Sequence, residues 1–188
     1  VGTAWSDFGP ASVTLKLREI VATRIQNEGA VVDFPDAEAL NFQEAFVSIG
    51  DTTTIMAGKK GSIANLGDDV PYNFLGLFNS EKVDTGVWVP GAYRPDTGGH
   101  VIQVVSTVAD GITLKAGLEN LNDTVAAEAG TAIGVIEYAG NGIKAHVTGM
   151  AGGILDGNIE EWAVHAGFSG TFDNFAVTAA GAYGYDNV

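Results

Sequence analysis

Between residues 61 and 99 the chain reads GSIANLGDDVPYNFLGLFNSEKVDTGVWVPGAYRPDTGG, a long stretch with a strand-like segment on either side. It contains three of the five prolines of the chain and many aromatic residues. A connection of this length inside a compact domain is uncommon, and it is usually either functional or disordered. Because disordered segments contain few aromatic residues, this stretch is predicted to be an ordered, functional loop.

Apolar and polar residues alternate with a period of two on both sides of the loop. This period is typical of β-strands, and a helical stripe of period 3.6 fits the first such segment less well. The strands predicted in this way, about nine in number, lie at residues 13–25, 41–49, 53–60, 100–108, 112–119, 131–138, 143–150, 159–168 and 175–184.

The connections between these strands alternate between long and short, so one end of the sheet is expected to have tight turns and the other loops. Each strand has one apolar face and one mixed face: Leu114 and Leu118, for example, lie opposite Lys115 and Glu119. Aromatic residues lie near strand ends. Up-and-down antiparallel strands with these properties are typical of a transmembrane β-barrel with a polar lumen. A soluble sandwich gives the same alternation, so periodicity alone leaves both architectures open.

The composition excludes several classes of protein. A formal net charge of −14 disfavours a nucleic-acid partner, because phosphate binding needs clustered Lys and Arg. The lack of cysteine excludes a disulfide scaffold and a cysteine-based metal site. No apolar run reaches the roughly 18 residues of a membrane helix, which does not exclude a barrel, because barrel strands alternate. The chain begins at Val1 without Met or a signal peptide, so a mature, processed or partial chain is expected.

Two segments carry a resemblance to a known family, namely QEAFVSIGDTTTIMAGKKGSIAN (residues 43–65) and HVIQVVSTVADGITLKAGLENLND (residues 100–123). With the long loop between them, they resemble the general porins of the outer membrane, most closely the alphaproteobacterial porin family. The later hairpins AGNGIKAHVTG and FDNFAVTAAGAYGYD are rich in glycine and alanine and resemble that family in this respect. In that family, a strand ending in Gly and a basic residue leads into a loop that folds inside the barrel and narrows the pore. Gly58, Lys59 and Lys60, followed by residues 61–99, match this order.

The resemblance implies a single porin-like domain over residues 1–188, in which residues 61–99 form the constriction loop. Complete porins of this class have about 16 strands, so the chain is expected to be incomplete at its C-terminus. The resemblance further implies a homotrimer in contact with outer-membrane lipid and lipopolysaccharide. The expected function is passive diffusion of ions and small hydrophilic solutes, with no enzymatic activity, no cofactor and no nucleic-acid partner.

If the loop folds inward, its carboxylates face basic residues on the barrel wall. Rows of charged side chains set the selectivity of pores, and the acidic balance of the chain predicts a weak preference for cations. Lys16, Arg18 and Arg24 share strand parity and are expected to face one space. The acidic side of the predicted constriction consists of Asp68, Asp69, Glu81, Asp84 and Asp96, and the basic side of Lys16, Arg18, Arg24, Lys59 and Lys60.

Other candidate sites are weaker. The spacing of His100, His146 and His165 fits no zinc pattern, and Glu160 and Glu161 face opposite sides of a strand, which disfavours joint catalysis. Loops rich in Asp and Asn could hold calcium, but none has EF-hand spacing, and turn formation explains these residues. One alternative function stays open: a soluble, secreted all-β binding or surface-layer domain with residues 61–99 as its ligand site.

Overall fold

The computed structural model describes residues 2–19, 40–64, 95–121, 129–159 and 161–186. These residues form ten β-strands and contain no helix, which confirms the predicted all-β class; none of them, accordingly, lies in a helix that could cross a membrane. The strands are β1 (Gly2–Ser6), β2 (Gly9–Glu19), β3 (Leu40–Gly50), β4 (Thr53–Lys60), β5 (Gly99–Ala109), β6 (Ile112–Glu119), β7 (Thr131–Gly140), β8 (Ile143–Gly152), β9 (Glu161–Phe172) and β10 (Phe175–Asp186).

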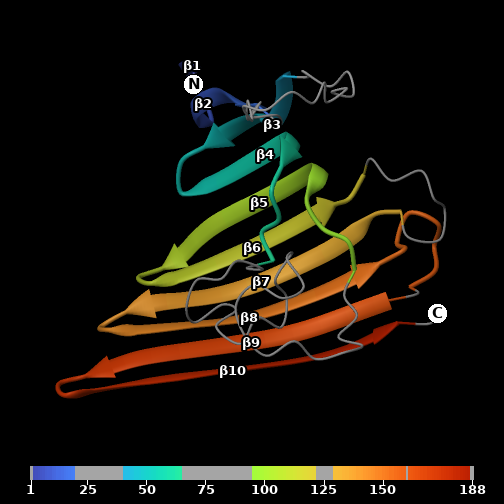
Figure 1. The fold of residues 1–188 in the computed structure, drawn as a ribbon. Coiled ribbons are helices and arrows are strands. Elements are labelled where there is room, and N and C mark those ends of the chain that lie inside the picture. The colour runs from blue at the N-terminus through green and yellow to red at the C-terminus, as the bar shows by residue number, and fades with distance from the viewer. Residues whose placement is uncertain (1, 20–39, 65–94, 122–128, 160, 187–188) are drawn as a thin grey trace, which may run out of the picture.

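All ten strands belong to one sheet, and their spatial order is their order in the chain. Each strand pairs antiparallel with the next, from β1 with β2 to β9 with β10. Figure 1 shows β1 and β10 at opposite margins of the sheet, and in the described part of the chain no ladder joins them. The predicted up-and-down arrangement is therefore confirmed, whereas closure of the sheet into a barrel stays a prediction.

Tight turns and long connections alternate along the chain, as predicted, and they lie at opposite ends of the sheet (Figure 1). Between β7 and β8, Asn141 and Gly142 have φ values of 50° and 75°. Two successive positive φ values are characteristic of a type I′ turn, which favours Asn-Gly and matches the twist of the flanking strands. The local sequence thus determines where this hairpin reverses.

The three largest differences from the predicted strands concern β1, β2 and β9, and the other boundaries differ by at most two residues. The short β1, which pairs with the start of β2, was not predicted, so there are ten strands and not about nine. β2 begins at Gly9 and not at residue 13, and residues 20–25 lie outside the described ranges. β9 continues to Phe172, although residues 169–174 were predicted to be a turn. Ladder pairing of Ser169–Phe172 with β10 outweighs the low strand propensity of Gly and Ser here.

The register separates two faces with different chemistry. One continuous row runs through Ile102, Leu118, Ala132, Ala151 and Trp162, from β5 to β9. We call the face that carries this row the apolar face. The adjacent row, on the other side of the sheet, contains Gln103, Gly117, Ile133, Met150 and Ala163. We call this second side the covered face, because residues 61–64 and 95–98 lie against it.

The core lies on the covered face. It consists of Ile63 and Ala64, which follow β4, and of four residues of the sheet itself. These four residues are Ile133, Val135, Met150 and Ala163. The apolar face is exposed instead: Ile136 is 58% and Val147 52% exposed.

Candidate functional site

Fully buried polar side chains are concentrated on the covered face. Gln103, Glu119, Thr131 and Thr148 are each 0% exposed, although such residues are usually found at protein surfaces. They lie on β5, β6, β7 and β8, so the polar character extends across the middle of the sheet. Burying a polar group costs free energy unless the group forms hydrogen bonds. The hydrogen-bond partners of these side chains therefore identify the segments that lie against the covered face.

The first partner is the segment that leaves β4, Gly61–Ala64, which we call the outgoing root of the long loop. Gln103 Nε2 donates to the carbonyl oxygen of Gly61 at 2.9 Å, and the backbone amide of Ile63 donates to Glu119 Oε1 at 2.9 Å. His165 Nε2 lies 2.8 Å from the carbonyl oxygen of Ala64. These contacts come from β5, β6 and β9, and Figure 1 shows the outgoing root running from β4 across the middle strands of the sheet.

The outgoing root also makes apolar contact with the sheet. Ile63 is 6% exposed and Ala64 0%, and both belong to the core on the covered face. A Cβ built on Gly117 would lie 2.9 Å from Ile63 Cδ1. Glycine at this position of β6 therefore leaves the space that the Ile63 side chain occupies, and the root is packed as well as hydrogen-bonded.

The second partner is the segment 95–98, the return root, through which the chain enters β5. Thr131 Oγ1 donates to the carbonyl oxygen of Asp96 at 2.5 Å, and the amide of Gly98 donates to Glu119 Oε2 at 2.6 Å. The carbonyl oxygen of Gly98 accepts from the amide of Asn120 at 2.7 Å. Both ends of the predicted constriction loop thus lie on the covered face of the sheet. The part between them, residues 65–94, lies outside the described residues.

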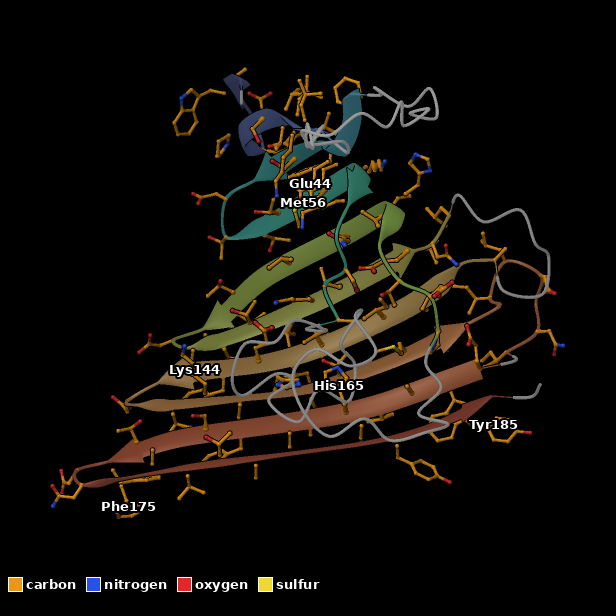
Figure 2. All side chains as sticks on the ribbon, viewed as in Figure 1. Glu44, Met56, Lys144, His165, Phe175 and Tyr185 are labelled. Carbon is orange, nitrogen blue, oxygen red and sulfur yellow. The ribbon has the colours of Figure 1, made fainter. Side chains whose placement is uncertain are left out.

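Charged and imidazole side chains form a chain across β6 to β9 of this face. Lys115 Nζ lies 2.5 Å from Glu137 Oε1, in a mostly buried ion pair. Glu137 is directly opposite His146 in the register of β7 and β8, and His146 Nε2 lies 2.9 Å from His165 Nδ1. Figure 2 shows His165 in the middle of the sheet.

The carbonyl oxygen of Ala64 can only accept, so Nε2 of His165 carries a proton. In the neutral pair, Nδ1 of His165 is therefore the acceptor, and His146 Nε2 donates to it. The two rings act as one unit that fixes the tautomer of each. In the part of the chain that the structure describes, no group of three or more His, Cys, Asp or Glu is placed to hold a metal ion.

The predicted constriction residues have different locations. Asp68, Asp69, Glu81, Asp84 and Arg24 lie outside the described residues. The described acidic residue, Asp96, has an exposed side chain and is held by its backbone. The structure does not test whether these carboxylates face a basic wall.

The described basic residues divide between the two faces. Lys16 of β2 lies opposite Glu44 on the covered face, and its side chain is exposed. Arg18 lies on the same strand, and only its backbone is described. Adjacent strand residues face opposite sides, so Lys60 lies on the covered face, with its Nζ 5.4 Å from the centre of the Phe46 ring. Lys59 lies on the apolar face, where it pairs with His100 in the register of β4 and β5. Of these two lysines, Lys60 is therefore the one that can belong to the predicted basic wall.

Sequence reasoning missed the residues that hold the roots: Gln103, Glu119, Thr131 and His165. Period two correctly placed Glu119 and His165 on the mixed face of their strands. It did not indicate that residues of four different strands meet the same loop, because that depends on register between strands. Comparisons with protein-family models, curated proteins and solved structures gave no significant match. The resemblance to porins therefore rests on the residues of this chain alone.

Proposed function

We propose that this chain forms the wall of a water-filled β-barrel in the bacterial outer membrane, through which ions and small hydrophilic solutes diffuse passively. The apolar face contacts lipid, and the covered face lines the lumen. Residues 61–99 fold into that lumen and narrow it, and the acidic balance of the chain produces a weak cation preference. A homotrimer, which the porin resemblance implies, stays a prediction.

The observation that carries this proposal is the inverted burial of the two faces. An antiparallel sheet in a water-soluble protein packs its apolar face on the core and exposes its polar face. Here Ile102, Ile136 and Val147 are each about half exposed, whereas Gln103 and Thr148 are fully buried. Apolar area in water costs roughly 25 cal/mol per Å², and large exposed apolar patches mark interaction surfaces. Lipid supplies the missing cover, and the strand ladders satisfy the backbone polar groups that lipid cannot.

The positions of the aromatic residues on the apolar face fit a membrane of ordinary thickness. Trp162 and Tyr183 lie near the end of the sheet with long connections, with ring centroids 5.6 Å apart, and Phe172 and Phe175 lie at the tight turn. Figure 2 shows Phe175 and Tyr185 at opposite ends of β10. The ten steps between consecutive residues from Trp162 to Phe172 span about 33 Å at roughly 3.3 Å each. At a tilt of about 40°, that length covers about 25 Å, the height of the apolar band between the aromatic girdles of such barrels.

The ends of the sheet suggest an orientation. Outer-membrane barrels have short periplasmic turns and longer extracellular loops. The turns at Asp51-Thr52, Asn141-Gly142 and Asp173-Asn174 would therefore face the periplasm. The long connections, of which residues 61–98 form one, would begin on the extracellular side.

A conductance measurement tests the pore directly. The protein, purified in detergent and added to planar bilayers, is expected to produce stepwise, ohmic current increases, with a reversal potential in a KCl gradient that indicates a modest cation preference. A preparation from cells that lack the protein is the control. A protein that stays monomeric and soluble without detergent, and that produces no steps, would contradict the proposal and favour the soluble binding domain.

Two adjacent alanines test which face contacts lipid. Ala179 and Ala180 lie in the middle of β10, on the apolar and the covered face respectively. Because the chain contains no cysteine, Ala179→Cys and Ala180→Cys each introduce a single thiol. In vesicles, Ala180→Cys should react faster with a charged, water-soluble thiol reagent, and Ala179→Cys with a lipid-soluble one. Equal reactivity at both positions would contradict the assignment of the faces.

A further inference from the structure

The carboxylate of Glu119 contacts both roots of the long loop. Glu119 is the last residue of β6 and is 0% exposed. Its Oε1 accepts from the amide of Ile63 at 2.9 Å, and its Oε2 accepts from the amide of Gly98 at 2.6 Å. Two residues that are far apart in the chain are thereby held at the two oxygens of one side chain.

Three further side chains contact the roots. Gln103 and His165 hold the outgoing root, and Thr131 holds the return root. Gln103 Nε2 also donates to Glu119 Oε1 at 2.7 Å, so it orients the carboxylate. Through its two oxygens, Glu119 joins the outgoing root to the return root.

We infer that Glu119 is a positioning residue that clamps the outgoing root and the return root together at the base of the long loop. The effect of the clamp on conduction rests on the proposed channel function, whereas the clamp itself can be measured without that function. In the proposed channel, loss of the clamp would free the two roots to move relative to the sheet.

The chemistry of the position favours a carboxylate. Two backbone N–H groups point at it, and an ionised carboxylate has two oxygens that only accept. Glutamine in its place would direct an NH₂ group at one of these amides, leaving a buried donor without an acceptor. Hydrogen bonds to a charged group are stronger than those between neutral groups. Glu119→Gln is therefore expected to release one root, at least in part.

Hydrogen exchange measures the clamp. In Glu119→Gln, the amides of Ile63 and Gly98 should exchange about 10-fold to 100-fold faster than in the wild type, in line with the loss of charged hydrogen bonds. The matched control is Glu137→Gln, which removes a carboxylate from the adjacent strand of the same face, one that binds Lys115 and neither root amide. Unchanged exchange at both amides in Glu119→Gln, or equal acceleration in the control, would overturn the inference.

A covalent bond replaces the clamp in a second variant. A Cβ built on Gly152 would lie 3.1 Å from Pro95 Cβ, close to the roughly 3.5–4.5 Å of a disulfide. Adding Pro95→Cys and Gly152→Cys to Glu119→Gln should tie the return root to β8. The oxidised triple variant should recover slow exchange at Gly98, and a reductant should abolish that recovery. This variant also permits the measurement if Glu119→Gln alone does not fold, and fast exchange in its oxidised form would contradict the clamp.

Single-channel recordings give the functional readout. Open-channel current noise in Glu119→Gln should exceed that of the wild type and of Glu137→Gln, and oxidation of the triple variant should lower it again. If the wild type forms no channels, the proposed function fails, whereas hydrogen exchange still tests the clamp. If the wild type conducts and Glu119→Gln shows neither faster exchange nor greater noise, the inference alone fails.

Discussion

Val147 and Thr148 are neighbours on β8, yet Val147 is 52% exposed and Thr148 is fully buried. In a water-soluble sheet the valine would be buried and the threonine exposed. The same inversion recurs on β5, where Ile102 is 50% exposed and Gln103 is 0% exposed. A pattern repeated on separate strands is a property of the whole face. On both strands the apolar side chain is exposed and the polar one is covered, which is the arrangement that the proposed barrel requires.

The largest expected effect comes from a charge placed on each face at the same height. Val104 and Val105 are adjacent on β5 and lie on the apolar and the covered face. Val104→Arg should weaken folding into lipid vesicles by about 2–4 kcal/mol, the cost of Arg at the middle of a barrel's lipid face. Val105→Arg, the matched control, should cost less than about 1 kcal/mol, since a lumen position keeps the charge hydrated. Urea titration in vesicles measures both values, and equal costs would remove the distinction between the faces.

A histidine substitution with an intermediate expected effect tests the hydrogen bonds of the covered face. His165→Phe removes the donor to the carbonyl oxygen of Ala64 and the acceptor for His146. Leaving such buried groups unsatisfied is expected to cost about 1–3 kcal/mol. His100→Phe is the control, because His100 is exposed and lies on the apolar face, where the change should stay within about 0.5 kcal/mol. Equal losses of stability in the two variants would show that the His165 contacts add nothing.

The smallest effect concerns one methyl group on each face. In Gly117→Ala, the new Cβ would lie 2.9 Å from Ile63 Cδ1, so the end of the Ile63 side chain must shift, at an expected cost of about 1 kcal/mol. At Gly134, on the apolar face, no atom lies within 4 Å of the added Cβ. Gly134→Ala should be neutral or stabilising by up to about 1 kcal/mol, because alanine restricts the unfolded chain. Opposite signs in the same titration confirm that the loop rests on the covered face, and equal values would contradict it.

Much of the fold could be predicted because its causes are local. Asn141-Gly142 specifies a tight turn, and the alternation within Ile112–Glu119 separates Leu114 from Lys115. The boundaries of β1 and β9 could not be predicted in the same way. Gly170 and Ser169 look like turn residues, and their pairing with both β8 and β10 keeps them extended.

The candidate site was less predictable than the fold. Reasoning from charge placed basic residues opposite the carboxylates of the loop, and that prediction stays open because most of these carboxylates lie outside the described residues. It gave no indication that the two roots bind Glu119 and other residues of β5 to β9. A buried carboxylate that accepts from backbone amides has no sequence signature, since its partners are N–H groups that almost every residue possesses. The pairing of His146 with His165 was hidden for a related reason, because their distance in the chain says nothing about strand register.

By itself, the sequence determined that the chain forms an up-and-down antiparallel sheet with one apolar and one mixed face, because turn chemistry and period-two alternation act over a few residues. It also determined that residues 61–99 interrupt that pattern. Only the tertiary structure decided that the mixed face is the covered one, with both roots of the loop held at Glu119. That outcome depends on the register of successive strands and on which face the chain crosses after β4. Neither is encoded within a single segment, because each is the sum of contacts between residues far apart in the chain.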